Sequence, residues 1–133
     1  MIFRCYSEVK EGICWTFHPF KSPVENFIRT DLNKTPMLIV FRTDYEKLLW
    51  DYVTGIYPIT DPRTNEIEQS FDPCFDNWIG KEDWNKILEK IKALLNRNHN
   101  RPPRLEKEFY YNFIEWIERE LQWADIIVID SNL

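Results

Sequence analysis

Two uninterrupted apolar runs constrain the fold of this 133-residue chain more than any other feature. Residues 37–41 are Met-Leu-Ile-Val-Phe, and residues 126–129 are Ile-Ile-Val-Ile. Apolar side chains at every position are typical of a strand covered on both faces, whereas a half-exposed strand alternates apolar and polar residues. The two runs therefore predict strands inside a sheet that has helices packed on it.

Four segments carry helical periodicity or helix start signals. Residues 81–96 and 105–123 each place apolar side chains at three- and four-residue spacing on one stripe, and they predict the two longest helices. Ser22-Pro23-Val24-Glu25 and Thr43-Asp44-Tyr45-Glu46 match the capping-box pattern, in which two side chains satisfy the first backbone N–H groups of a helix. They predict two shorter helices, the second ending at Gly55.

The remaining strand signals are shorter. Residues 2–7 and 13–17 are rich in β-formers and flank a segment that ends in Gly12, which predicts a hairpin. Residues 56–59 and 66–71 predict two further strands around a turn. The expected fold class is α/β or α+β, with a mixed sheet of four to six strands and about four helices.

Size and composition indicate one domain over residues 1–133, and 44% hydrophobic residues suffice for a single core. The chain lacks a leader pattern and any apolar stretch near 18 residues, so a cytoplasmic protein without a membrane segment is expected. Cys5, Cys14 and Cys74 are an odd, widely spaced set, which favours free thiols. Because no catalytic, nucleotide or metal motif occurs, we expect neither an enzyme nor a cofactor or metal site.

Negative charge is concentrated between residues 61 and 83. This segment has seven acids and two bases, a net charge of −5, which equals the net charge of the whole chain. The remaining residues therefore carry equal numbers of acids and bases. Focused negative charge steers association with a basic partner, whereas it disfavours nucleic acid as a direct partner.

Three interpretations of these acids remain open. Asp72, Asp76, Glu82 and Asp83 could serve a metal or a carboxylate-pair enzyme, but the calcium-loop pattern is absent and no histidine is near. They could instead face a partner protein. They could also have only local roles, because acids in the first turn of a helix are favourable and Asp76 can cap a turn.

Trp78 and His18 each allow two interpretations. Trp78, inside the acidic segment, is either an aromatic anchor at an interface or a buried core residue. His18 could pair with Cys14 or with a distant carboxylate for acid–base chemistry, or it could be a hydrogen-bonded core residue like most isolated histidines. His99 is the second histidine and lies in a polar loop.

Two stretches carry a resemblance. One is Phe71-Asp72-Pro73-Cys74-Phe75-Asp76-Asn77-Trp78-Ile79-Gly80 running into a helix, and the other is the ending from Phe113 to Leu133. Together they resemble small bacterial immunity proteins, which neutralise the toxin domains of polymorphic and contact-dependent growth inhibition systems. The resemblance implies tight stoichiometric inhibition of a cognate toxin C-terminal domain, often a nuclease with a basic cleft.

The expected function is therefore that of an immunity protein that binds a basic toxin domain. The expected partner-binding residues are Glu66, Glu68, Asp72, Phe75, Asp76, Trp78, Glu82 and Asp83. The alternative is a small cytoplasmic ligand-binding domain or enzyme with a pocket between sheet and helices. A third interpretation is a homodimeric scaffold that uses the aromatic helix at residues 105–123. Strand order and oligomeric state are left open.

Overall fold

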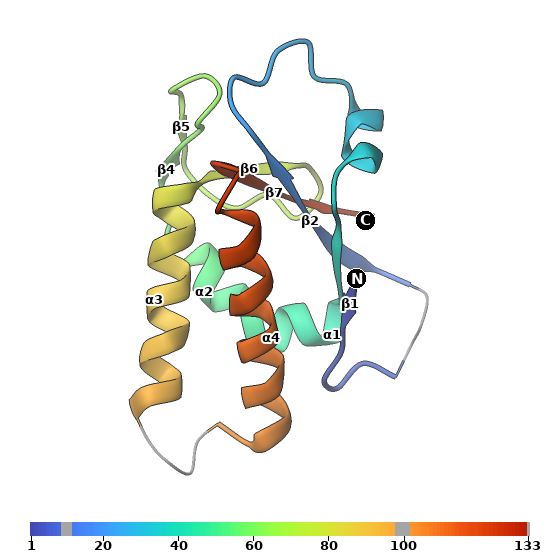
Figure 1. Cartoon of the computed structure of the whole chain (residues 1–133), viewed down its shortest axis with the longest axis vertical. Coiled ribbons are helices and arrows are strands. Elements are labelled where there is room, and N and C mark those ends of the chain that lie inside the picture. Colours follow the sequence, from blue (N-terminus) through green and yellow to red (C-terminus); the bar gives the residue numbers. More distant parts are fainter. Residues whose placement is uncertain (9–11, 98–101, 133) are drawn as a thin grey trace.

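A mixed five-stranded sheet organises the molecule (Figure 1). The computed structural model describes residues 1–8, 12–97 and 102–132. The strand order is β1-β3-β2-β7-β6, with β1 parallel to β3 and the other neighbours antiparallel. The strands are β1 (Ile2–Phe3), β2 (Cys14–Phe20), β3 (Leu38–Phe41), β6 (Asn77–Gly80) and β7 (Ile126–Ser131). A separate two-stranded sheet pairs β4 (Ile59–Thr60) with β5 (Ile67–Glu68).

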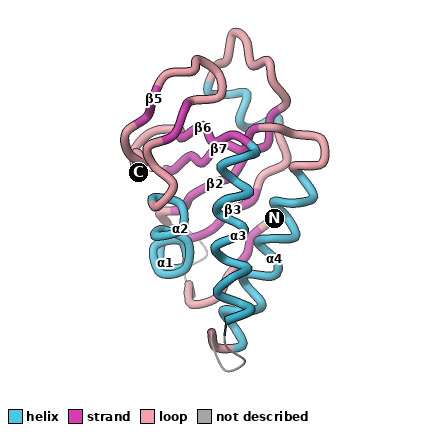
Figure 2. Tube along the Cα trace, turned by 90° about the vertical axis from the view of Figure 1, so that its left-hand side faces the viewer, coloured by secondary structure: helices cyan, strands magenta, loops and turns pink. Residues whose placement is uncertain are grey.

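The helices lie mainly on one face of the sheet. They are α1 (Arg42–Asp44), which continues through a π-helical stretch η2 (Tyr45–Leu49) into α2 (Trp50–Thr54), then α3 (Lys81–Arg97) and α4 (Arg104–Glu120). Helices α3 and α4 lie side by side and extend past the sheet (Figures 1 and 2). Among the described residues, none of the helices combines the length and apolar character needed to cross a membrane.

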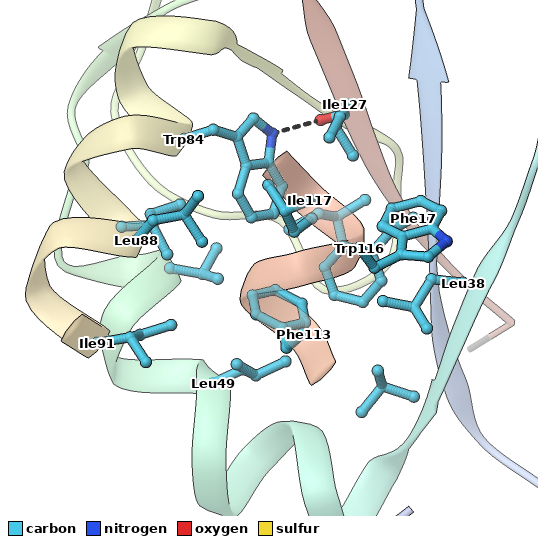
Figure 3. Close-up of a cluster of buried hydrophobic side chains, with 14 of the residues drawn as sticks. Phe17, Leu38, Leu49, Trp84, Leu88, Ile91, Phe113, Trp116, Ile117 and Ile127 are labelled. Atoms are coloured by element: carbon cyan, nitrogen blue, oxygen red, sulfur yellow. Dashed lines mark hydrogen bonds between the residues drawn. The ribbon is translucent and has the colours of Figure 1, made fainter. Parts of the chain in front are cut away.

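Strand β7 is central and pairs with β2 on one side and β6 on the other. Its residues 126–129 are all at most 1% exposed, because helices cover one face and a loop segment covers the other. On the helix side, Ile127 and Ile129 join a core with Phe17, and Trp84 donates its indole N–H to the carbonyl oxygen of Ile127 at 3.0 Å (Figure 3). Double coverage explains the uniform hydrophobicity of this run.

The opposite face of the sheet has a smaller apolar cluster. Ile126, Val128 and Trp78 point to this face because side chains alternate along a strand. Leu32, from the 3-10 helix η1 (Arg29–Lys34), completes the cluster. This face is therefore covered by the segment between β2 and β3 and not by a long helix.

The predicted fold class is confirmed, since the described residues form a mixed α/β arrangement with four α-helices and a five-stranded mixed sheet. The predicted long helices agree with α3 and α4, and both apolar runs form strands. Of the strands predicted at residues 56–59 and 66–71, only Ile59 and Ile67–Glu68 are in strands, since β4 is Ile59–Thr60 and β5 is Ile67–Glu68.

The predicted hairpin between residues 2–7 and 13–17 is wrong. Strand β3 lies between β1 and β2, and β1 ends at Phe3. The reason is the buried carboxylate of Asp44, which accepts hydrogen bonds from the backbone N–H groups of Cys5 (2.9 Å), Tyr6 (2.6 Å) and Ser7 (3.2 Å). These donors therefore cannot join a strand ladder. The capping box predicted at Thr43-Asp44-Tyr45-Glu46 does not form either, because α1 begins after Phe41 and Thr43 is not its N-cap.

The predicted helix at Ser22 is also wrong. The backbone N–H and the hydroxyl of Ser22 both bond to the carboxylate of Asp125, so Ser22 does not cap a following helix. Helical structure begins only at Arg29, in η1. Strand β6 was not predicted, because its sequence Asn-Trp-Ile-Gly carries only a weak alternating pattern beside the acidic residues.

The aromatic stripe of residues 105–123 belongs to the core. Phe109, Phe113, Trp116 and Ile117 of α4 are each at most 3% exposed. These side chains are therefore not available for a dimer interface, whereas Tyr111 on the same helix is 56% exposed.

Replacing Asp44 with alanine should destabilise the protein by about 2–4 kcal/mol, because three backbone N–H groups lose a charged acceptor. Urea unfolding followed by circular dichroism measures the change. Glu46→Gln, two residues further along at an exposed position, is the control and should change stability by less than about 0.5 kcal/mol. Equal effects of the two variants would contradict this role of Asp44.

Candidate partner-binding surface

The predicted acids lie in three parts of the structure. Glu66 precedes β5 and Glu68 lies within it, Asp72 and Asp76 lie in the loop before β6, and Glu82 belongs to the first turn of α3. The structure therefore brings together residues from a small hairpin, a loop and a helix start, which the sequence alone could not position relative to one another.

A cavity of about 220 Å³ lies where the hairpin meets the loop. Its walls are Tyr57, Asp61, Arg63, Glu68, Ser70, Asp72, Phe75, Asp76, Asn77 and Trp78. Five of the eight predicted partner-binding residues line it. This cavity is called the acidic cavity below, and Glu66 does not line it.

The other predicted acids lie elsewhere. Glu82 and Asp83 line a different cavity, of about 520 Å³, together with Lys81 and Lys86. Asp83 forms an ion pair with Lys86 at 3.4 Å. The acids predicted to form one face therefore lie in two separate regions, a strongly negative cavity and a region of mixed charge.

Three of the four carboxylates that line the acidic cavity form no ion pair with a described residue. Asp61 is 5% exposed and pairs with Arg63 at 3.0 Å. Over the described ranges, no lysine or arginine pairs with Glu68, Asp72 or Asp76. Four carboxylates and one guanidinium give the lining a formal charge of −3.

Tyr57 is kept as a neutral phenol in this region. Its pKa is raised far above its usual value, first by burial and then by the charges of Glu68, Asp83 and Asp61. Burial disfavours the charged phenolate, and the neighbouring carboxylates add to that effect.

Trp78 is 3% exposed, so the exposed-anchor interpretation is wrong and the burial interpretation is correct. Its ring packs against Phe20 and Phe27, with centroid distances of 5.4 and 4.9 Å. The guanidinium of Arg63 lies 3.9 Å from the ring centroid on the cavity side, a cation–π contact. The indole N–H donates to the carboxylate of Asp76.

One exposed apolar group accompanies the carboxylates. Phe75 lines the cavity and is 63% exposed. Ile67 is 67% exposed but does not belong to the cavity lining. Tyr57 lines the cavity and was missed from the sequence, because it reaches the cavity only through the tertiary fold.

The loop that carries Asp72 and Phe75 is held in place by Asn77, which is 7% exposed. Its side-chain amide donates to the carbonyl oxygens of Asp72 (2.7 Å) and Phe75 (3.0 Å) and accepts from the backbone N–H of Asp72 (2.8 Å). Ser131 also donates its hydroxyl to the carbonyl oxygen of Pro73. The acidic cavity is therefore preorganised, which lowers the entropic cost of binding.

His18 is a buried, hydrogen-bonded residue. It is 2% exposed, and its two ring nitrogens lie 2.8 Å from the Thr16 hydroxyl and 3.1 Å from the Thr35 hydroxyl. Burial lowers its pKa to about 4, so it is a weak base at neutral pH. Neither a cysteine nor a carboxylate pairs with it, so the acid–base interpretation is unsupported. His99 lies outside the described residues.

The side chains in the described ranges include no group of three or more His, Cys, Asp or Glu residues arranged to hold a metal ion. Comparisons with protein-family models, with curated proteins and with solved structures find no match to this chain. The functional argument therefore depends on the chemistry of the surface itself.

The lowered pKa of His18 predicts a pH dependence of stability. The unfolded imidazole titrates near 6.5 and the folded one near 4, so stability is fully present above the unfolded value and is lost as the pH falls towards 4. Between pH 7 and 5 the native protein should lose about 2 kcal/mol more than the His18→Gln variant. Urea unfolding at both pH values measures this, and parallel losses would show that His18 is already charged in the native state.

Proposed function

We propose that this protein is an immunity protein that binds and neutralises a basic bacterial toxin domain through the acidic cavity. The observation that carries the proposal is the set of carboxylates that have no cation partner among the described residues, Glu68, Asp72 and Asp76, beside the exposed apolar side chain of Phe75 in the same cavity lining. Carboxylates steer the partner and apolar groups supply contact area, the combination found in tight interfaces.

Charge complementarity indicates the class of partner. A nuclease must present cationic groups to hold the phosphates of its substrate. A preorganised negative cavity offers that cleft a competing set of anions, and long-range attraction raises the association rate by factors of about 10–1,000. The sequence resemblance to immunity proteins supports the same class of partner.

The direct test is protection from toxicity. The C-terminal domain encoded by the reading frame directly upstream is expressed alone and together with this chain, and growth and complex formation are measured. Protection and a one-to-one complex are expected. A toxic domain that this chain neither binds nor blocks would remove the proposal.

Charge reversal tests the surface within that complex. Glu68→Lys combined with Asp72→Lys changes the formal charge of the lining from −3 to +1 and should lower the association rate at least about tenfold at low salt. Stopped-flow measurements at low and high salt follow the rate and its salt dependence, which should weaken.

The matched control is Glu89→Lys with Glu115→Lys, an equal change in net charge at exposed positions on α3 and α4. Neither residue lines the acidic cavity. The control should keep an association rate within about threefold of the native value, as expected for screened charges far from the interface. A control as slow as the cavity variant would mean that net charge alone, and not this surface, directs binding.

A further inference from the structure

A second cavity, of about 400 Å³, lies on the sheet face opposite the long helices, between the sheet and η1. Its walls are Cys14, Thr16, His18, Arg29, Thr30, Leu32, Asn33, Met37, Asp130, Ser131 and Asn132. None of these residues lines the acidic cavity. The volume is within the usual range for small-molecule sites.

Three ionisable groups of this wall are held towards their neutral forms. Burial is the largest cause in each case: it raises the pKa of the Cys14 thiol, lowers the pKa of His18 to about 4, and raises the pKa of Asp130 despite the nearby Arg29. Clustered shifts of this kind are typical of functional sites. They also mean that an additional charge in this cavity would be poorly solvated.

The hydrogen-bond network fixes which atoms face the cavity as acceptors. The Thr35 hydroxyl donates to the carbonyl oxygen of Leu32 at 3.0 Å, so it accepts from the Nδ1–H of His18. The other ring nitrogen then has a lone pair and accepts the hydroxyl proton of Thr16 at 2.8 Å, a shorter contact than the 3.4 Å from the same hydroxyl to the carbonyl oxygen of Asp130. The oxygen of Thr16 is left with a lone pair for a ligand.

Donors come from the opposite wall. Arg29 uses one terminal nitrogen for both bonds to Asp130, at 2.8 and 3.0 Å. Its remaining N–H groups, and the side chains of Thr30 and Asn33, make no hydrogen bond to any described residue. The pair of Arg29 and Asp130 is itself neutral overall, so the wall offers donors and acceptors without net charge.

We propose that this second cavity binds a small uncharged polyol, of the size of a monosaccharide. Each hydroxyl of a polyol both donates and accepts, so it can satisfy this mixed wall without leaving a buried polar atom unpaired. An ionic ligand would meet the same desolvation cost that lowers the pKa of the buried His18 in this wall. The lining has no Phe, Tyr or Trp side chain on which a nucleobase could stack.

The test is an NMR titration of the isotope-labelled protein with D-glucose and D-ribose, and separately with the charged relatives D-gluconate and D-glucosamine. Saturable shifts of the backbone amides of Thr16, Asn33 and Asn132 are expected with at least one uncharged sugar at millimolar concentration. The charged relatives should bind at least about tenfold more weakly.

Substitutions at Asn33 test whether the sugar binds in this cavity. Asn33→Ala should weaken the sugar response about fivefold through the loss of a hydrogen bond, and Asn33→Trp should abolish it by filling the mouth of the cavity. Both changes are at an exposed position and should leave the fold intact. The control Asn112→Ala, exposed on α4, should have no effect.

Three results would overturn the proposal: no saturable shift with either uncharged sugar, tighter binding of a charged relative, or an equal response of Asn33→Ala and Asn112→Ala. Because the two cavities share no residue, the Glu68→Lys and Asp72→Lys variant should bind sugar normally. The result of the sugar titration therefore does not depend on whether the proposed immunity function is correct.

Discussion

The position of β7 between β2 and β6 is the constraint on which the rest of the structure depends. Its helix-facing side chains complete the main core, and its opposite side chains form the smaller cluster with Trp78. Pairing with β6 sets the start of α3 and the end of the acidic loop, and Ser131 of β7 bonds to that loop directly. Pairing with β2 places Thr16 opposite Asp130 and so builds the floor of the second cavity. The acidic cavity and the second cavity therefore both depend on the strands that pair with β7.

The parts of the fold that the sequence could predict are those determined by local pattern. The runs at residues 37–41 and 126–129, and the stripes of α3 and α4, bury their side chains with the periodicity that they show in the sequence. The errors have a common cause. Asp44 and Asp125 each capture backbone donors that lie far away in the sequence, and such a bond leaves no local pattern to find. The capping-box interpretation gave those segments a local explanation, whereas tertiary contacts determine them.

The candidate site was predictable in composition but not in arrangement. Charge counting identified the acids between residues 61 and 83, and five predicted residues do line one cavity. It could not separate Glu82 and Asp83, whose position beside Lys81 and Lys86 depends on how α3 packs. Trp78 shows the same limit, because an aromatic residue next to carboxylates can equally be a contact residue or the buried support beneath one. Its burial gives Arg63 a ring to stack on, and so keeps the one cation of the cavity at the wall.

The arrangement of the sheet has a kinetic consequence. Residues that meet across β2 and β7, such as Thr16 and Asp130, are 114 positions apart, whereas α3 and α4 are consecutive in the chain. Closing so long a loop lowers the chain entropy before the stabilising contacts form, so folding should be slow for a domain of this size. Folding should start with the pairing of α3 and α4, because these helices are close in the sequence. Until the distant strands meet, their apolar runs stay unprotected. The acids that surround β6 would then also keep partly folded chains apart through mutual repulsion.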